Sequence, residues 1–80
     1  MKAIVYTTSW CPYCVEAKNY LHNKGVEVVE KDIEADEQNK QELLDKVGFY
    51  NGVPVIEING HLLDRFDPLQ IDLAIENPPS

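Results

Sequence analysis

Apolar residues along the chain follow two different spacings, which separate candidate strands from candidate helices. A nearly continuous apolar run at residues 3–6 is typical of a strand that is buried on both faces. Residues 13–24 carry apolar side chains at helical spacing, directly after a proline at the position suited to a first helical turn. A valine-rich segment at residues 26–33 predicts a second strand.

The middle of the chain predicts a second helix. Asp36 is a suitable N-cap, and helical spacing continues to about Lys46. Gly48 then provides a glycine where helices commonly end. The stretch between residues 36 and 48 is therefore expected to connect the second strand to a third.

The last part of the chain predicts a hairpin followed by a helix. Residues 55–58 have the composition of a strand, and the Asn-Gly pair at 59–60 is a strong hairpin signal, so residues 61–64 should return antiparallel. The Asp-Pro pair at 67–68 has the form of a helix start. The predicted order is β-α-β-α-β-β-α, an α/β domain with a mixed four-stranded sheet and three helices.

The two cysteines lie three positions apart, between the first strand and the first helix, in the segment Cys11-Pro12-Tyr13-Cys14. A C-x-x-C pair can close into a disulfide within one helical turn and open again. At a helix N-terminus the first thiolate is stabilised by the helix dipole and free N–H groups, and the thiolate is the species that attacks a disulfide. We therefore predict that Cys11 and Cys14 are catalytic, with Cys11 as the partly exposed nucleophile and Cys14 as the more buried resolving thiol.

A structural disulfide and a zinc site are the other uses of such a pair. A disulfide that closes so short a loop adds little stability. Zinc needs four ligands, and only His22, His61 and carboxylates could complete the set. A zinc-binding interaction module remains an alternative that metal analysis would test. We predict no metal site and no tightly bound cofactor.

Length and charge narrow the class of protein further. The 80 residues suffice for one domain, 1–80, of which 77–80 are expected to form a frayed tail. A net charge of −7 argues against binding to nucleic acid or to an anionic membrane. The short apolar start predicts no signal peptide or membrane span, so we expect a cytoplasmic monomer, in a compartment where disulfides are usually transient and catalytic.

Several of these motifs together resemble the glutaredoxin branch of the thioredoxin fold. Tyr6-Thr7 ahead of the Cys-Pro-Tyr-Cys segment is similar to the active-site approach of that family, and Val53-Pro54 is similar to its Val-Pro with a cis peptide bond. The resemblance implies a thioredoxin-like fold and a disulfide oxidoreductase that serves electron transport and cell redox homeostasis. It also implies contacts to substrate or glutathione from four residues, namely Val53, Pro54, Phe66 and Asp67.

Three positions depart from the family pattern. Thr8 stands where the family often has lysine, Trp10 is typical of thioredoxins, and Asp64-Arg65 replaces the usual Gly-Gly. The partners expected are disulfide-containing proteins, with either glutathione as co-substrate or thioredoxin reductase as the source of electrons.

The residues around the cysteines are expected to tune the site. Pro12 and Tyr13 fix the start of the helix, cover one side of the sulfur and affect the reduction potential. Trp10 is predicted to contact both the site and the scaffold, and to form a rim on which a partner docks. A different class of function also stays open, in which two chains bridge a [2Fe–2S] cluster through Cys11 and two glutathiones, although such carriers usually have a Cys-Gly-Phe-Ser site.

Overall fold

All seven predicted elements are present in the predicted order in the computed structural model, which describes residues 2–50 and 52–76. The strands are β1 (Lys2–Thr7), β2 (Glu27–Asp32), β3 (Val55–Ile58) and β4 (His61–Leu63). The helices are α1 (Pro12–Asn23), α2 (Glu37–Val47) and α3 (Pro68–Glu76). The tail predicted at 77–80 lies outside the described residues.

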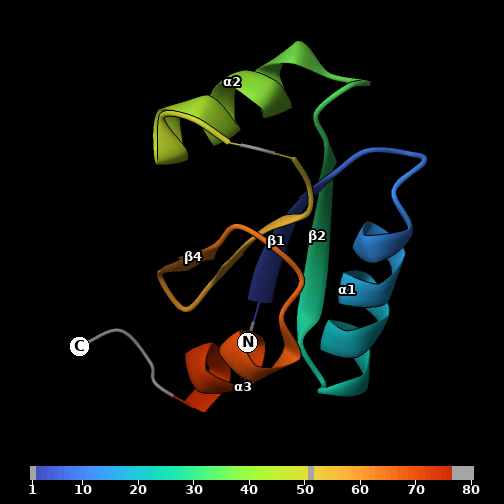
Figure 1. Ribbon diagram of the computed structural model, residues 1–80, viewed down its shortest axis with the longest axis vertical. Helices are drawn as coiled ribbons and strands as arrows, with labels where there is room; N and C mark the ends of the chain where they lie inside the picture. The colour runs from blue at the N-terminus through green and yellow to red at the C-terminus, as the bar shows by residue number, and fades with distance from the viewer. Residues whose placement is uncertain (1, 51, 77–80) are drawn as a thin grey trace.

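The four strands form one mixed sheet in the order β2-β1-β3-β4. β1 is parallel to β2, while the pairs β1–β3 and β3–β4 are antiparallel. Figure 1 shows α1 running alongside β2, with α2 and α3 at opposite ends of the view. The prediction of a mixed four-stranded sheet with three helices is confirmed.

The sheet is covered on both faces, and β1 explains how. Val5 packs among residues of α1 and α3, whereas its neighbour Tyr6 packs with Leu43 of α2 on the opposite face. Successive side chains of a strand point to opposite faces, so a strand between two helical layers needs apolar residues at consecutive positions. The continuous apolar run at residues 3–6 therefore reflects the burial of β1 on both faces of the sheet.

Polar contacts fasten α2 to its face of the sheet. The Tyr6 hydroxyl donates to Glu42 Oε2 at 2.6 Å, and Lys31 Nζ lies 2.8 Å from both Glu42 oxygens. Lys46 bonds Glu57 of β3 at 2.7 Å. The hydrogen bonds from Lys31 and Tyr6 lower the pKa of Glu42, so this carboxylate stays ionised at neutral pH. These contacts fix the position of α2 over β1 and β3.

Both ends of α2 follow the sequence signals. Asp36 accepts a hydrogen bond from the Gln38 N–H at 2.9 Å, which satisfies one of the N–H groups that a helix leaves unpaired at its start. At the other end Gly48 has a φ of 75°, a conformation that glycine adopts without steric cost. The helix therefore begins and ends where its sequence predicts.

Replacement of Asp36 with alanine is expected to lower the free energy of unfolding by about 1 kcal/mol, because the Gln38 N–H loses its acceptor. Asp36→Asn is the matched control, since asparagine also caps helices well. Urea denaturation of the three proteins would check this. An equal loss in both variants would contradict the capping role.

Candidate active site

The two cysteines lie where β1 passes into α1. Residues 8–11 connect the strand to the helix, and Cys11 occupies the N-cap position of α1. Cys11 is 6% exposed and Cys14 is 1% exposed, and both thiols are free. Cys11 is the more accessible of the pair, but the prediction that it is partly exposed is wrong: it is buried, because its sulfur turns toward a neighbouring loop.

That loop contains the peptide bond between Val53 and Pro54, which is cis, as the resemblance implied. The Cys11 thiol donates to the Val53 carbonyl oxygen at 3.6 Å. The register explains this proximity: Val55 of β3 pairs with Tyr6 of β1, so the residues just before β3 lie beside the carboxyl end of β1. The structure therefore brings Val53 and Cys11 together.

Cys14 lies one helical turn after Cys11 and is less accessible to solvent. Burial raises the pKa of its thiol above the ordinary value, and the neighbouring Cys11 acts in the same direction. Hydrogen bonds from the Thr7 hydroxyl and the Thr8 backbone N–H act in the opposite direction, because they stabilise the thiolate. Thr7 is itself 1% exposed, and its hydroxyl donates to the Thr8 carbonyl oxygen at 3.1 Å, so this single O–H must turn toward Cys14 Sγ to stabilise the thiolate.

Replacement of Thr7 with valine is expected to raise the pKa of Cys14 further, since the thiolate loses a hydroxyl donor while the side-chain shape is kept. The rate at which iodoacetamide alkylates the thiol, measured against pH in a Cys11→Ser background, reports Cys14 alone, because the chain contains no third cysteine. Thr7→Ser restores a hydroxyl and should return the titration toward that of the parent. A titration that is the same with valine as with threonine would show that the hydroxyl does not stabilise the thiolate.

Two aromatic side chains flank the cysteines on the outside. Trp10 is 73% exposed and Tyr13 is 62% exposed. The indole Nε1 of Trp10 donates to Glu34 Oε1 at 2.9 Å. The expected contact between Trp10 and the scaffold is therefore a hydrogen bond to an exposed carboxylate, and most of the ring faces solvent.

The residues expected to hold glutathione are only partly brought together. Pro54 is buried beside Val53 in the loop that faces Cys11. Phe66 packs edge-on against Tyr20 of α1, with ring centroids 5.9 Å apart. Asp67 accepts from the Leu69 N–H at 3.1 Å, so it is the N-cap of α3. The hydrogen bond confirms the capping prediction for Asp67 and leaves its contact to glutathione a prediction.

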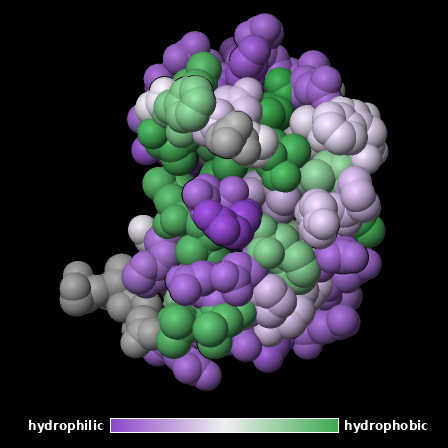
Figure 2. Space-filling model, in the orientation of Figure 1, coloured by the Kyte–Doolittle hydropathy of each residue, from purple (hydrophilic) through white to green (hydrophobic). Residues whose placement is uncertain are grey.

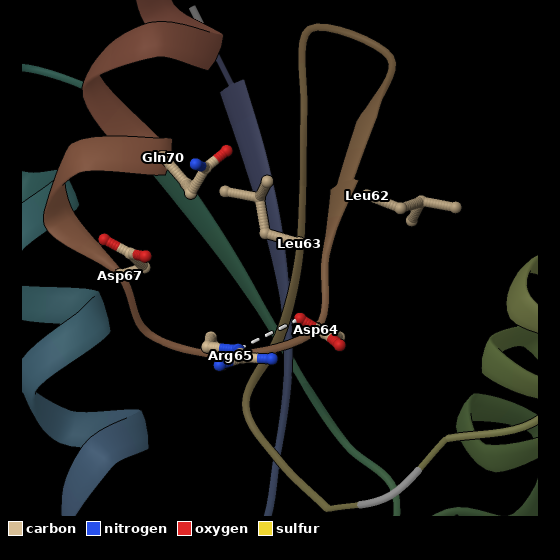
Figure 3. Close-up of a pocket in the computed structure, with 6 residues that line it drawn as sticks. All are labelled: Leu62, Leu63, Asp64, Arg65, Asp67 and Gln70. Atoms are coloured by element: carbon tan, nitrogen blue, oxygen red, sulfur yellow. Dashed lines mark hydrogen bonds and ion pairs between the residues drawn. The ribbon is translucent and has the colours of Figure 1, made fainter.

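A hollow of about 300 Å³ lies between β4 and the start of α3, and Figure 3 shows Leu63 and Gln70 facing each other across it. Asp67 lines this hollow, but Val53, Pro54 and the cysteines do not. The pair that replaces the glycines of the family is also there, with Arg65 Nε 3.4 Å from Asp64 Oδ1. Charged side chains therefore occupy positions at which the family usually has none.

Sequence reasoning named Thr7 only as part of the resemblance, without a role, and missed Glu34 altogether. Thr7 and Asp32 are register partners at the ends of the parallel strands β1 and β2, so the loops that follow them lie side by side. This pairing brings Glu34 to Trp10, 24 positions away in the chain. A polar residue at the end of a buried apolar strand is a signal that could have indicated the role of Thr7, whereas nothing local in the sequence indicates Glu34.

Other kinds of site find little support in the described part of the chain. Residues 2–50 and 52–76 contain no group of three or more His, Cys, Asp or Glu side chains placed to hold a metal ion. None of their helices is both long enough and apolar enough to cross a membrane. The free dithiol at the start of α1 is the feature with evident chemistry.

A dithiol at the first helix of a mixed sheet, facing a cis-proline loop, defines a thioredoxin-like fold with the site of a thiol–disulfide oxidoreductase. The glutaredoxin family model matches residues 3–63. A glutaredoxin-like 8.6 kDa protein encoded in the rubredoxin operon of Clostridium pasteurianum is 35% identical over 72 residues, which cover 90% of this chain and 95% of that protein. The chain belongs to the glutaredoxin family, whose members are thiol–disulfide oxidoreductases.

Further relatives show how the family varies around this chain. The N-acetyl-S-hydroxy-L-cysteine reductase of Bacillus subtilis is 38% identical over 78 residues, which cover 92% of this chain and 83% of that protein. Among solved structures, the thioredoxin-like protein BC3987 superposes with a TM-score of 0.81 at 26% identity, over 90% of this chain and 97% of that one. The NrdH-redoxin of Escherichia coli shares the fold, with a TM-score of 0.73 at 22% identity over 100% and 99% of the two chains.

Proposed function

We propose that this protein reduces disulfides of other proteins through a dithiol cycle that begins at Cys11. The Cys11 thiolate attacks one sulfur of the substrate disulfide, forms a mixed disulfide and expels the other substrate sulfur as a thiolate. The Cys14 thiolate then attacks Cys11 Sγ, which closes the Cys11–Cys14 disulfide and releases the second substrate thiol. Two electrons pass from protein to substrate, and two protons complete the two substrate thiols.

The unequal placement of the two sulfurs is the observation that carries this assignment. Cys11 lies at the N-cap of α1, faces the loop at Val53, and is 6% exposed against 1% for Cys14. Cys14 is almost fully buried, and burial raises the pKa of its thiol, so it is the less suited of the pair to the first attack on a substrate. The backbone around Val53, next to Cys11, could pair with an extended substrate in the manner of an added strand.

We further infer that a thioredoxin-reductase-type enzyme, rather than glutathione, returns the protein to the dithiol state. Glutathione carries two carboxylates, which are usually bound by cations. Thr8, at a position where the family often has lysine, is neutral and buried, and Arg65 lies against Asp64. Glutathione is used across the glutaredoxin family and remains the alternative co-substrate; buckwheat glutaredoxin, which shares the fold, has been solved as a complex with glutathione.

Recovery of free thiols from the oxidised protein tests both parts of this proposal. One arm contains glutathione with glutathione reductase, and the other contains NADPH with thioredoxin reductase. We expect recovery in the second arm and little in the first. Rapid recovery with glutathione would assign the protein as a glutathione-dependent reductase, and failure in both arms would contradict the dithiol cycle. Visible absorbance of the freshly purified protein would instead support the cluster-carrier alternative.

A further inference from the structure

Trp10 is an unusual residue to leave in solvent directly beside a nucleophile. The residue is 73% exposed, although indole is among the side chains that gain most from burial. The hydrogen bond to Glu34 ties the indole to the β2–α2 connection. The fold therefore holds the indole of Trp10 next to Cys11 but leaves it exposed. This arrangement is expected of a surface that contacts a partner protein.

Glu34 adds a negative charge at the edge of the same ring. One of its oxygens accepts from the indole, and among the described residues no lysine or arginine forms an ion pair with it. Five of the chain's seven cations, Lys18, Lys24, Lys31, Lys46 and Arg65, have carboxylate partners elsewhere. In Figure 2 pale residues of intermediate hydropathy gather over the β1–α1 connection, with hydrophilic residues above them over the β2–α2 connection.

We propose that Trp10 and Glu34 together form a docking point for a basic side chain, above all arginine, that lies close to the target disulfide of a protein substrate. A guanidinium group can stack on an indole face and at the same time bond a carboxylate in its own plane. The Trp10–Glu34 pair offers both partners within one hydrogen bond of each other. This inference rests on the proposed function and names the substrate class: disulfides flanked by arginine.

Two peptides that differ only in an arginine or a citrulline measure the contribution of this contact separately from the reactivity of the disulfide. Each peptide carries one cysteine in a mixed disulfide with 2-mercaptoethanol, and arginine at successive positions on either side is compared with citrulline, its neutral isostere. The rate with excess reduced protein is divided by the rate with dithiothreitol, which removes differences in intrinsic reactivity. At the best position we expect arginine to be favoured about five- to tenfold, the size of one exposed cation–π contact together with one exposed ion pair.

Two variants separate the charge from the ring. Glu34→Gln keeps an acceptor for the indole and removes the charge, so part of the preference for arginine should be lost, and salt should affect the remainder less than in the parent. Trp10→Ala should remove nearly all of the preference. Glu27→Gln, at the opposite end of β2, makes the same change of net charge and should leave the preference intact.

The outcomes distinguish this inference from the function on which it rests. If arginine and citrulline peptides react equally at every position while both are reduced, the docking point is refuted and disulfide reduction stands. Equal loss of preference in Glu34→Gln and Glu27→Gln would show a diffuse effect of net charge, which also contradicts a local site. If neither peptide is reduced, the proposed function itself fails.

Discussion

Replacement of Cys11 with serine is expected to abolish disulfide reduction, with a loss on the order of a thousandfold or more, because a serine hydroxyl is not ionised at neutral pH and forms no mixed disulfide. The variant should fold normally, because the Cys11 thiol donates to the Val53 carbonyl, which a serine hydroxyl can also do, and the backbone hydrogen bond from Cys11 to the Thr8 carbonyl is kept. Reduction of a neutral disulfide such as hydroxyethyl disulfide, coupled to a thioredoxin reductase, measures the loss.

Replacement of Cys14 with serine has a different expected outcome, and the contrast tests the roles of the two thiols. The first attack by Cys11 should proceed, but the mixed disulfide should then accumulate, because no second thiol is present to resolve it. Turnover with thioredoxin reductase should cease, and only a glutathione-dependent half-reaction could persist, if the protein has one. Equal and partial losses in the Cys11→Ser and Cys14→Ser variants would contradict the assigned order.

The largest expected effect on stability comes from the helix that carries the cysteines. Leu21 of α1 is fully buried in the core shared with α3 and one face of the sheet. Replacement of Leu21 with alanine is expected to lower the free energy of unfolding by about 3 kcal/mol, as lost apolar burial and a residual cavity both contribute. A domain of this size is stable by only about 5–10 kcal/mol, so the loss is a large share of the total.

A second helical leucine provides the control for this substitution. Leu69 of α3 is 66% exposed, so Leu69→Ala should change the free energy of unfolding by less than about 0.5 kcal/mol. Urea denaturation followed by circular dichroism would report both variants. Similar losses in the two would mean that Leu21 is not part of the core that fixes α1 against the sheet.

Local signals predicted the fold well because the turns and helix ends that separate its elements depend on single residues. The hairpin at Asn59-Gly60 is an example, since both residues have positive φ, 52° and 80°, as an Asn-Gly turn between two strands requires. Asp36 and Asp67 cap their helices as predicted, each through its own side chain. The turn and the caps are each determined by a few consecutive residues, so the sequence alone is enough to predict them.

The features that escaped prediction depend on contacts between distant segments. Glu34 reaches Trp10 only because β1 and β2 are parallel and in a particular register. The low exposure of Cys11 results from the loop at Val53, 42 positions further along the chain. The apolar pattern of α3 also did not show that Leu69 and Leu73 stay exposed while Ile71 is buried. Such details follow from tertiary packing, which no local pattern encodes.

The most direct test of the central claim is to identify the cysteine that carries the substrate during turnover. Reduced parent protein would be mixed with a peptide disulfide, quenched with acid at successive times, digested and mapped by mass spectrometry. The account predicts an early mixed disulfide on Cys11 alone, followed by the Cys11–Cys14 disulfide with free peptide. A mixed disulfide found on Cys14, or spread equally over both cysteines, would contradict it.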